Sequence, residues 1–341
     1  MTDPSAGLDP GFEFFLGERP AIPGMRDSAT LWIMDAAGAL AFPRVTFDAI
    51  ADDWERPWIQ LNFVDRNGRT LRLWSQEPGH LAVDGAGRSA IRGAGPLRFQ
   101  CVEPFRRWTM EFRGKALQST TTAQMAGEPD GDPVDLAFRF EAEMAAPPWL
   151  MGGLTAEAAR NMRSRDANAL MGGVRYEQLC RVKGTIEIAR QVHTIAGTGM
   201  RVRRQGVRNM GAALGHCQHS ALFPSGRGFG AIVMAPGPEG PEAFNEAFLF
   251  DEGGHRVAAR IVKAPWMRRL IENGDDASLV LDTAEGQVLI EGQVLSSVFD
   301  RHLFEMADTS ILHQGAARYV WNGEETIGLI ERCTLKNRIE P

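Results

Sequence analysis

Short alternating segments joined by Gly, Asn and Asp are the feature that most limits what this chain can fold into. One alternating run, Trp58-Ile-Gln-Leu-Asn-Phe-Val64, is followed by Asp65-Arg-Asn-Gly68 and then by a second run, Thr70-Leu-Arg-Leu-Trp74. An Asn-Gly pair readily takes the positive φ angles that a tight hairpin needs. The pattern therefore predicts antiparallel strands joined by hairpins.

The same pattern recurs along most of the chain. Turns are expected at 84–87, 225–228, 251–254, 285–286 and 322–323. Clean alternation predicts strands over 108–113 and 136–144. Further strands are expected over 175–182, 184–188, 191–195, 213–223, 228–234, 245–250, 257–262, 278–281, 287–294, 318–321 and 326–331. The eight strands expected from residue 213 onward are enough for a second barrel of about eight strands.

One segment has the pattern of a helix instead. Thr155 is a good cap for a run over 156–170 that is rich in Ala, Arg, Asn and Met and ends before Gly172-Gly173. The apolar stripe of this run is ragged, so it is expected either to pack against a barrel or to cover a barrel mouth. A length of 341 residues favours two domains or one large β assembly. We expect an all-β fold of two antiparallel β-barrel domains, residues 1–208 with a short helical insertion near 155–171 and residues 209–341.

Composition excludes several classes of partner. The formal net charge is −6, and the 37 basic residues form no long run, so nucleic acid is not expected as a partner. The first 24 residues have no pattern of a secretory signal, and no run of about 18 apolar residues predicts a membrane span. We expect a cytoplasmic protein. The four cysteines show no Cys-x-x-Cys spacing, which favours buried free thiols over disulfides or a zinc site.

Four arginines, at 201, 203, 204 and 208, lie within eight residues of this acidic chain. In an extended segment Arg201 and Arg203 point to one face, and Arg204 and Arg208 to the other. All four are candidate substrate-binding residues, because guanidinium groups in an apolar cavity hold a carboxylate, enolate or phosphate strongly. The alternative is a set of structural salt bridges with Glu177, Glu187 and other strand acids.

Four further residues are candidates for proton transfer. Tyr176 lies beside Glu177, although alternation places the two on opposite faces; a core tyrosine is the alternative. His216 and His219 are three residues apart on a predicted strand, which sends them to opposite faces and argues against a shared metal ion. Either could be a general base or a structural histidine, and His193 is a candidate by its position before the arginine segment.

Spaced motifs along the chain resemble the AttH-like group, which includes the carotenoid 1,2-hydratases. The residues that carry the resemblance are Arg106-Arg-Trp108, Phe112-Arg-Gly114, Tyr176-Glu-Gln178 with Gly184, the segment 199–208, 223–229, 319–324 and Ile330-Glu-Arg332. The resemblance implies two lipocalin-like barrels with a ligand cavity at or near their interface, and apolar substrates such as terpenoids, steroids or polycyclic compounds. Gln178 and Trp321 join the substrate-binding candidates because they lie in these motifs.

The chain departs from the group at one point. Where the family commonly has Asp-His-Ser/Asn-Trp-Gly, alignment on Gly206 places Val202, Arg203, Arg204 and Gln205. The acidic residue that would protonate an alkene is therefore missing from its expected place.

Two functions follow as hypotheses. The first is a lyase or isomerase of the hydratase, dehydratase or cyclase type, with no metal or other cofactor, that acts on a hydrophobic small molecule. The second is a non-catalytic carrier of an apolar metabolite, for which a barrel is sufficient. A structural partner domain without an enclosed cavity is a third possibility. A homodimer is compatible with each.

Overall fold

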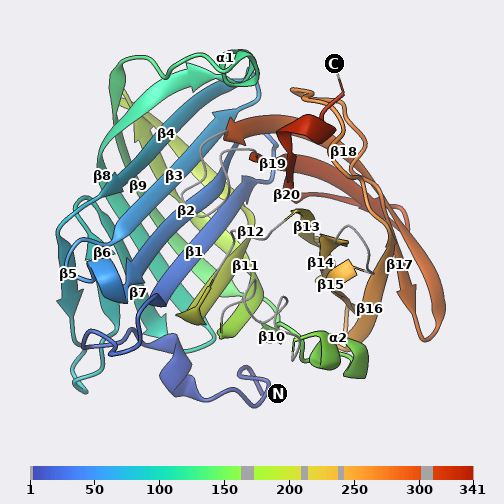
Figure 1. Cartoon of the computed structure of the whole chain (residues 1–341), viewed down its shortest axis with the longest axis horizontal. Coiled ribbons are helices and arrows are strands. Elements are labelled where there is room, and N and C mark those ends of the chain that lie inside the picture. The colour runs from blue at the N-terminus through green and yellow to red at the C-terminus, as the bar shows by residue number, and fades with distance from the viewer. Residues whose placement is uncertain (1–2, 163–172, 209–213, 237–241, 301–309, 341) are drawn as a thin grey trace.

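The computed structural model describes residues 3–162, 173–208, 214–236, 242–300 and 310–340. Two β-barrels lie side by side in it, the first in blue to yellow-green and the second in gold to red (Figure 1). The predicted all-β fold of two barrels is confirmed. No helix in these ranges is both long and apolar enough to cross a membrane.

The first barrel is a closed ring of eight strands. Its order is β11-β12-β1-β2-β3-β4-β8-β9, and the ring closes because β9 pairs with both β8 and β11. Strands β5 to β7 continue the sheet from β8, and β10 pairs with β11. The bounds are β1 (Met25–Asp35), β2 (Leu40–Ile50), β3 (Trp58–Asp65), β4 (Arg69–Gln76), β5 (Gly79–Ala82), β6 (Ile91–Ala94), β7 (Leu97–Glu103), β8 (Arg107–Thr120), β9 (Pro133–Met144), β10 (Trp149–Leu150), β11 (Val174–Ile188) and β12 (Gln191–Val207).

The second barrel is closed by eight strands in sequence order, as its hairpin signals predict. At the hairpin between the last two strands, Asn322 and Gly323 both have positive φ, 50° and 78°, which is the geometry expected of an Asn-Gly turn. The bounds are β13 (Gly215–Leu222), β14 (Gly228–Pro236), β15 (Glu242–Phe250), β16 (Arg256–Lys263), β17 (Leu279–Thr283), β18 (Gly286–Asp300), β19 (Ser310–Trp321) and β20 (Glu324–Leu335).

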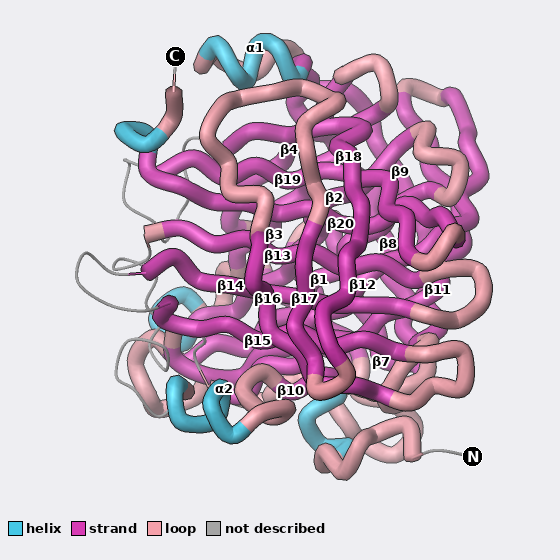
Figure 2. Tube along the Cα trace, turned by 90° about the vertical axis from the view of Figure 1, so that its right-hand side faces the viewer, coloured by secondary structure: helices cyan, strands magenta, loops and turns pink. Residues whose placement is uncertain are grey.

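Helical segments lie at the ends of the molecule, outside the strands (Figure 2). They are α1 (Thr121–Ala126), α2 (Ala156–Asn161) and the 3-10 turns η1 (Pro10–Glu13), η2 (Ala51–Asp53) and η3 (Lys336–Arg338). Thr155 caps α2 as predicted, through a hydrogen bond from the Ala158 amide to its hydroxyl. Residues 163–170 of the predicted helix lie outside the described residues, whereas the short helix α1 was not expected.

Alternation along the strands divides most of the buried apolar residues that the structure describes among three large cores. One core fills the first barrel and another fills the second. A third core lies between the barrels, where the outward faces of both contribute side chains such as Trp32, Met200, Ile232 and Phe248. The outer face of each barrel is therefore buried where the barrels meet.

The predicted strands omitted β1, β2, β5 to β7 and β10, and for β1 the reason is visible in its burial. Ten of the eleven residues of β1 are buried, so both of its faces are covered. Such a strand has no solvent-facing positions to mark with polar residues, and its periodicity is lost. The strands expected over 175–182 and 184–188 are one continuous strand, β11.

The N-terminal turn η1 closes one end of the first barrel. The Glu13 carboxylate is fully buried there and lies 2.6 Å from the guanidinium of Arg201. It also accepts hydrogen bonds from the Phe105 amide at 2.7 Å and from Trp108 Nε1 at 2.8 Å. This end of the first barrel is filled by an internal ion pair.

Candidate functional site

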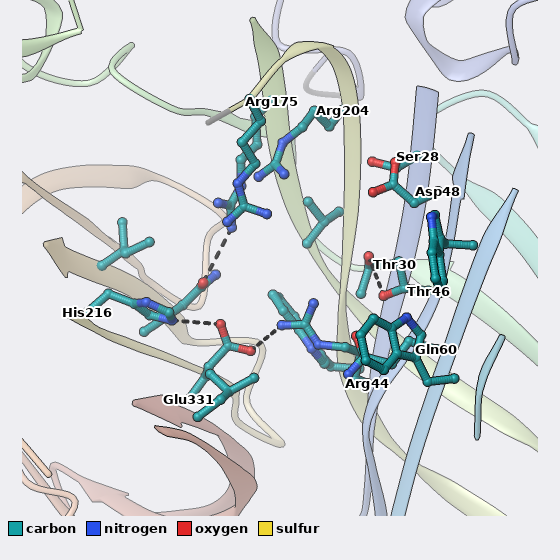
Figure 3. A pocket seen from close by; sticks show the side chains of 18 of the residues that line it. Ser28, Thr30, Arg44, Thr46, Asp48, Gln60, Arg175, Arg204, His216 and Glu331 are labelled. Carbon is teal, nitrogen blue, oxygen red and sulfur yellow. Dashed lines mark hydrogen bonds and ion pairs between the residues drawn. The ribbon is translucent and has the colours of Figure 1, made fainter. Parts of the chain in front are cut away.

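A cavity of about 140 Å³ lies between the two barrels, outside the interior of each (Figure 3). Its walls come from outward-facing positions of β1 to β4, β11 and β12 on one side and β13, β14, β19 and β20 on the other. The lining residues are Ser28, Thr30, Trp32, Arg44, Thr46, Asp48, Trp58, Gln60, Trp74, Arg175, Val202, Arg204, Arg208, His216, Gln218, Ile232, Met234, Leu312 and Glu331.

A histidine and a carboxylate meet at the wall formed by the second barrel. His216 on β13 and Glu331 on β20 are on adjacent strands, and His216 Nε2 lies 2.8 Å from Glu331 Oε1 (Figure 3). Arg44 on β2 of the first barrel reaches the other carboxylate oxygen at 2.6 Å. The three side chains form a chain of charge and hydrogen bonds across the interface.

A second pair of polar residues fixes the Glu331 carboxylate in place. Gln314 on β19 donates a hydrogen bond from its Nε2 to Glu331 Oε2. Asn62 on β3 donates in turn to the Gln314 oxygen at 2.8 Å. Both amide side chains are buried. The contact between Asn62 and Gln314 joins the two barrels, and the contact between Gln314 and Glu331 holds the carboxylate.

These contacts keep Glu331 ionised. Burial favours the neutral acid, but the cation of Arg44 and then the hydrogen bonds from His216 and Gln314 hold the pKa of Glu331 well below its usual range. An ionised carboxylate only accepts hydrogen bonds. His216 Nε2 therefore carries the proton of this contact.

The ring nitrogen on the other side of His216 has a different environment. His216 is 5% exposed, and its Nδ1 makes no hydrogen bond with any residue of the described ranges. When Nε2 carries a proton in the neutral ring, Nδ1 carries a lone pair. The contact with Glu331 thus sets the tautomer in which Nδ1 can accept a proton.

A second buried cluster of polar side chains, Arg175, Glu177 and Gln218, also joins the two barrels. Arg175 on β11 forms an ion pair with Glu177, and Gln218 on β13 donates to both oxygens of Glu177 at 2.9 and 3.0 Å. Burial raises the pKa of Glu177 despite these two partners, and the charge of Glu331 adds to the effect. Arg175 and Arg204 both point toward the cavity from the same side (Figure 3).

Tryptophans form the aromatic part of the lining. Trp58 on β3 and Trp74 on β4 have ring centroids 5.2 Å apart, and Trp74 is 43% exposed. Trp32 on β1 is buried, and the guanidinium of Arg44 lies 6.0 Å from the centre of its ring. The cavity combines flat apolar surfaces with a polar wall.

A family model described as a domain of unknown function (DUF7064) matches residues 19–336, nearly the whole chain. The chain belongs to this family. No curated protein matches the DUF7064 chain significantly.

Solved structures with the same two-barrel architecture include three proteins of low sequence identity. A putative AttH from Nitrosomonas europaea is 15% identical, with a TM-score of 0.55 over 93% of this chain and 97% of that one. CghA in complex with Sch210972 is 10% identical, with a TM-score of 0.58 over 95% and 97%. Kievitone hydratase from Nectria haematococca is 9% identical, with a TM-score of 0.51 over 94% and 92%. The AttH-like fold expected from the resemblance is confirmed.

Three of the four arginines of this DUF7064 chain, at 201, 203 and 204, lie within β12, and Arg208 follows its last residue; their side chains point to two faces as alternation predicts. Arg204 and Arg208 line the cavity between the barrels. Arg201 and Arg203 point into the first barrel, where Arg201 contacts Glu13 and Arg203 lies 2.8 Å from Asp27. The two inward arginines form buried ion pairs and do not line this cavity. Asp27 is one of the strand acids expected as alternative partners, whereas Glu13 lies in η1, and neither arginine pairs with Glu177 or Glu187.

Tyr176 and Gln178 also point into the first barrel. The Tyr176 hydroxyl donates to the Glu13 carboxylate and the Gln178 oxygen accepts from Arg201. Burial, followed by the charge of Glu13, raises the pKa of Tyr176 far above its usual range. Neither side chain lines the inter-barrel cavity, and Tyr176 has the core position that was its alternative.

The remaining sequence candidates are dispersed. His219 points into the second barrel, where its Nδ1 lies 2.7 Å from the Tyr319 hydroxyl and burial lowers its pKa to about 3. Trp321 packs on Phe223 inside the same barrel. His193 is exposed on β12, away from the cavity. His216, Arg204 and Arg208 are the candidates that the structure brings together.

Sequence reasoning missed Arg44 and Arg175, and it assigned Glu331 only to a barrel strand. A signal for Glu331 exists, because its nearest neighbours on the same face of the strand, Ile327, Leu329 and Cys333, are apolar. A charge at such a position is costly unless it has a partner. In the part of the chain that the structure describes, no three His, Cys, Asp or Glu side chains are grouped as metal ligands.

Proposed function

We propose that this protein is an acid–base enzyme of the lyase or isomerase type, acting without a cofactor on a hydrophobic small molecule held between its two barrels. The observation that carries the proposal is the contact of His216 Nε2 with Glu331 at 2.8 Å, which leaves Nδ1 without a partner among the described residues. His216 is the general base in this proposal, and Glu331 is its positioning residue.

The role of Glu331 has two parts. Its contact orients the imidazole and selects the tautomer with a lone pair on Nδ1. When Nδ1 takes a proton, the ring becomes a cation next to a buried carboxylate that Arg44 and Gln314 hold in the ionised form. The Glu331 carboxylate therefore stabilises the positive charge that develops on the His216 ring.

The proposed reaction begins with transfer of a proton from a carbon next to a carbonyl group of the substrate to His216 Nδ1. The electron pair of the broken C–H bond moves to the carbonyl oxygen, and the resulting enolate lies near Arg175 and Arg204. Return of the proton to another carbon gives isomerisation. Its transfer to a departing β-hydroxyl releases water and forms a double bond, and the reverse steps are a hydration.

Two further facts support this class of reaction. Kievitone hydratase, a protein named for a hydration reaction, has the same fold, although its 9% identity supports only the architecture. The missing acid at the family position near Gly206 is consistent with a base-initiated reaction, because protonation of an alkene is then not the first step.

The experiment compares His216→Asn with His193→Asn. A panel of aryl β-hydroxyketones and aryl enones is incubated with each protein in D₂O, and hydration, dehydration and deuterium incorporation are followed by NMR. Loss of a general base should lower the rate by about 10² to 10⁴. His193→Asn is the matched control because His193 is exposed and distant from the cavity.

Unchanged turnover by His216→Asn contradicts the proposal. Binding of panel compounds without conversion or deuterium uptake supports the alternative, a non-catalytic carrier. The substrate class, the cytoplasmic location and the homodimer predicted from the sequence remain predictions.

A further inference from the structure

Another buried polar cluster lies inside the first barrel, apart from the cavity between the barrels. It contains side chains that the sequence analysis singled out and that the proposed reaction does not use, and each of them is at most 2% exposed: Trp108, Tyr176, Gln178, Arg201 and Arg203. Four of them contact residues 12–16, which we call the N-terminal plug, and Gln178 contacts Arg201. The plug thus occupies the place on which these side chains converge.

The barrel holds the N-terminal plug through its polar atoms, as a binding site holds a ligand. The guanidinium of Arg203 donates hydrogen bonds to the backbone oxygens of Phe12 at 3.3 Å and Phe14 at 3.0 Å. The plug belongs to no strand of the described sheets, and the Phe15 amide joins it to the rest of the barrel by donating to the Ser89 carbonyl at 2.9 Å. Side chains, more than strand pairing, keep the plug in place.

Two side chains anchor the plug. Among residues 3–24, Glu13 and Phe15 are the buried ones. Trp108 contacts both of them, because its Nε1 donates to the Glu13 carboxylate at 2.8 Å and its ring lies edge-on to Phe15 with the centroids 5.7 Å apart. The guanidinium of Arg203 lies 4.7 Å from the centre of the Phe15 ring. The barrel therefore recognises a carboxylate and an aromatic ring together.

The carboxylate is the part that this end of the barrel requires. Glu13 lies 2.6 Å from Arg201, and it also accepts hydrogen bonds from the Phe105 amide and Trp108. Asp27, a second buried acid, lies 2.8 Å from Arg203 and pairs with that arginine. Loss of the acid partner of a buried guanidinium is strongly unfavourable. If the plug withdraws, another carboxylate has to take the place of Glu13 beside Arg201.

We propose that this end of the first barrel is a second ligand site, for a carboxylic acid that carries an aromatic ring, and that the N-terminal plug occupies it as an internal ligand. The carboxylate of the free ligand takes the place of Glu13 beside Arg201, and its ring takes the place of Phe15 against Trp108. The N-terminal region lies beneath the strands of this barrel (Figure 1), so its departure unpairs no strand. The site is separate from the cavity between the barrels and independent of the proposed reaction.

The first test replaces the Glu13 side chain by a free ion. Glu13→Ala removes the atoms beyond Cβ, which together have the structure of acetate. Acetate should therefore stabilise Glu13→Ala in thermal unfolding, and at ten times its dissociation constant the ratio of folded to unfolded protein should rise about elevenfold. Acetamide at the same ionic strength should have no such effect.

The matched control for this test is Glu18→Ala. Glu18 is exposed in the same N-terminal region, so its replacement should create no response to acetate. Adding Arg201→Met to Glu13→Ala should abolish the response, because the cation that attracts the ion is then missing. Equal effects of acetate and acetamide on Glu13→Ala, or an equal response of Glu18→Ala to acetate, overturn the carboxylate site.

The second test uses the unmodified full chain and detects displacement of the plug. Backbone amide exchange is followed by mass spectrometry with 3-phenylpropionate, and with 3-phenylpropionamide as the neutral control. The Phe15 amide donates to Ser89, and the Leu16 amide donates to Asp27 at 2.8 Å. The acid at ten times its apparent dissociation constant should speed exchange of both amides about tenfold, while exchange in β12 stays unchanged. Unchanged or slower exchange at Phe15 and Leu16, or an equal effect of the amide, overturns the proposal.

A third measurement assigns the ring. Phe15→Ala removes much of the apolar contact that retains the plug and frees the place of the ring, so in calorimetry it should bind 3-phenylpropionate about tenfold more tightly than the parent. Glu18→Ala should bind the acid as the parent does. Binding by Phe15→Ala that is no tighter than binding by the parent overturns the assignment of the ring to the place of Phe15.

Discussion

Arg44 of the first barrel and Glu331 of the second barrel form an ion pair of 2.6 Å between residues 287 positions apart in the sequence. The contact joins β2 to β20 and holds the carboxylate that orients His216. This pair therefore joins the two barrels and also sets the proton position on the candidate base. Stability and activity should depend on it together.

Replacement of Arg44 by Met should destabilise the protein by about 2–4 kcal/mol, because the Glu331 carboxylate then stays buried without its cation. The pKa of Glu331 should rise, so that the acid limb of the activity profile moves to higher pH. Guanidinium unfolding and a pH–rate profile measure the two effects. Arg44→Lys should recover part of both, and equal stability of parent and Arg44→Met would contradict the assigned role.

Substitution of Glu13 by Gln should reduce stability most at neutral pH. Burial opposes ionisation of Glu13, but Arg201 and then hydrogen bonds from Tyr176, Phe105 and Trp108 lower its pKa below the ordinary 4.5. A carboxyl with a depressed folded-state pKa contributes stability that is complete above its unfolded pKa and is lost as the pH falls through its folded pKa. The difference in unfolding free energy between parent and variant should shrink below about pH 4.5; a difference that grows in acid would refute this.

Arg203 and Arg204 are neighbours in sequence, but their substitutions should have opposite effects. Arg203→Ala leaves buried Asp27 without its partner at 2.8 Å and should cost about 3–5 kcal/mol of stability. Its turnover of the aryl β-hydroxyketones and enones should be near that of the parent under conditions where it is folded. Arg204→Ala should lower that turnover, since Arg204 lines the cavity near the proposed enolate. NMR turnover assays and thermal unfolding compare the two variants, and the reverse pattern would contradict the directions of these side chains.

All four cysteines should be unreactive in the native protein. Cys101, Cys180, Cys217 and Cys333 are buried and free, as predicted from their spacing. Burial raises the pKa of Cys101, Cys180 and Cys217 to about 12 and that of Cys333 further, so almost no thiolate is present at neutral pH. Ellman's reagent should detect four thiols in denaturant and essentially none without it. Rapid labelling of a native thiol would show that the barrels open.

Much of the fold could be predicted because alternation marks a strand with one covered face. This holds for β3, β4, β8 and β9, whose outer positions are largely polar and whose turns contain Gly or Asn. It fails for β1, which is covered by the first core on one face and by the second barrel on the other. The candidate site was predicted only in part, because His216, Arg204 and Arg208 were named without Glu331, Arg44 or the tryptophans that accompany them.

The sequence alone determined that Arg201 and Arg203 diverge from Arg204 and Arg208, and that His216 diverges from His219, because the two-residue period of a strand is a local property of the backbone. Only the tertiary structure decided which of these faces meets a cavity. Docking of the barrels turns an outer face into an interior, and it brings together Arg44 and Glu331 across 287 residues. Local periodicity carries no information about that docking, because the residues that contact each face of a strand come from strands that are distant in the sequence.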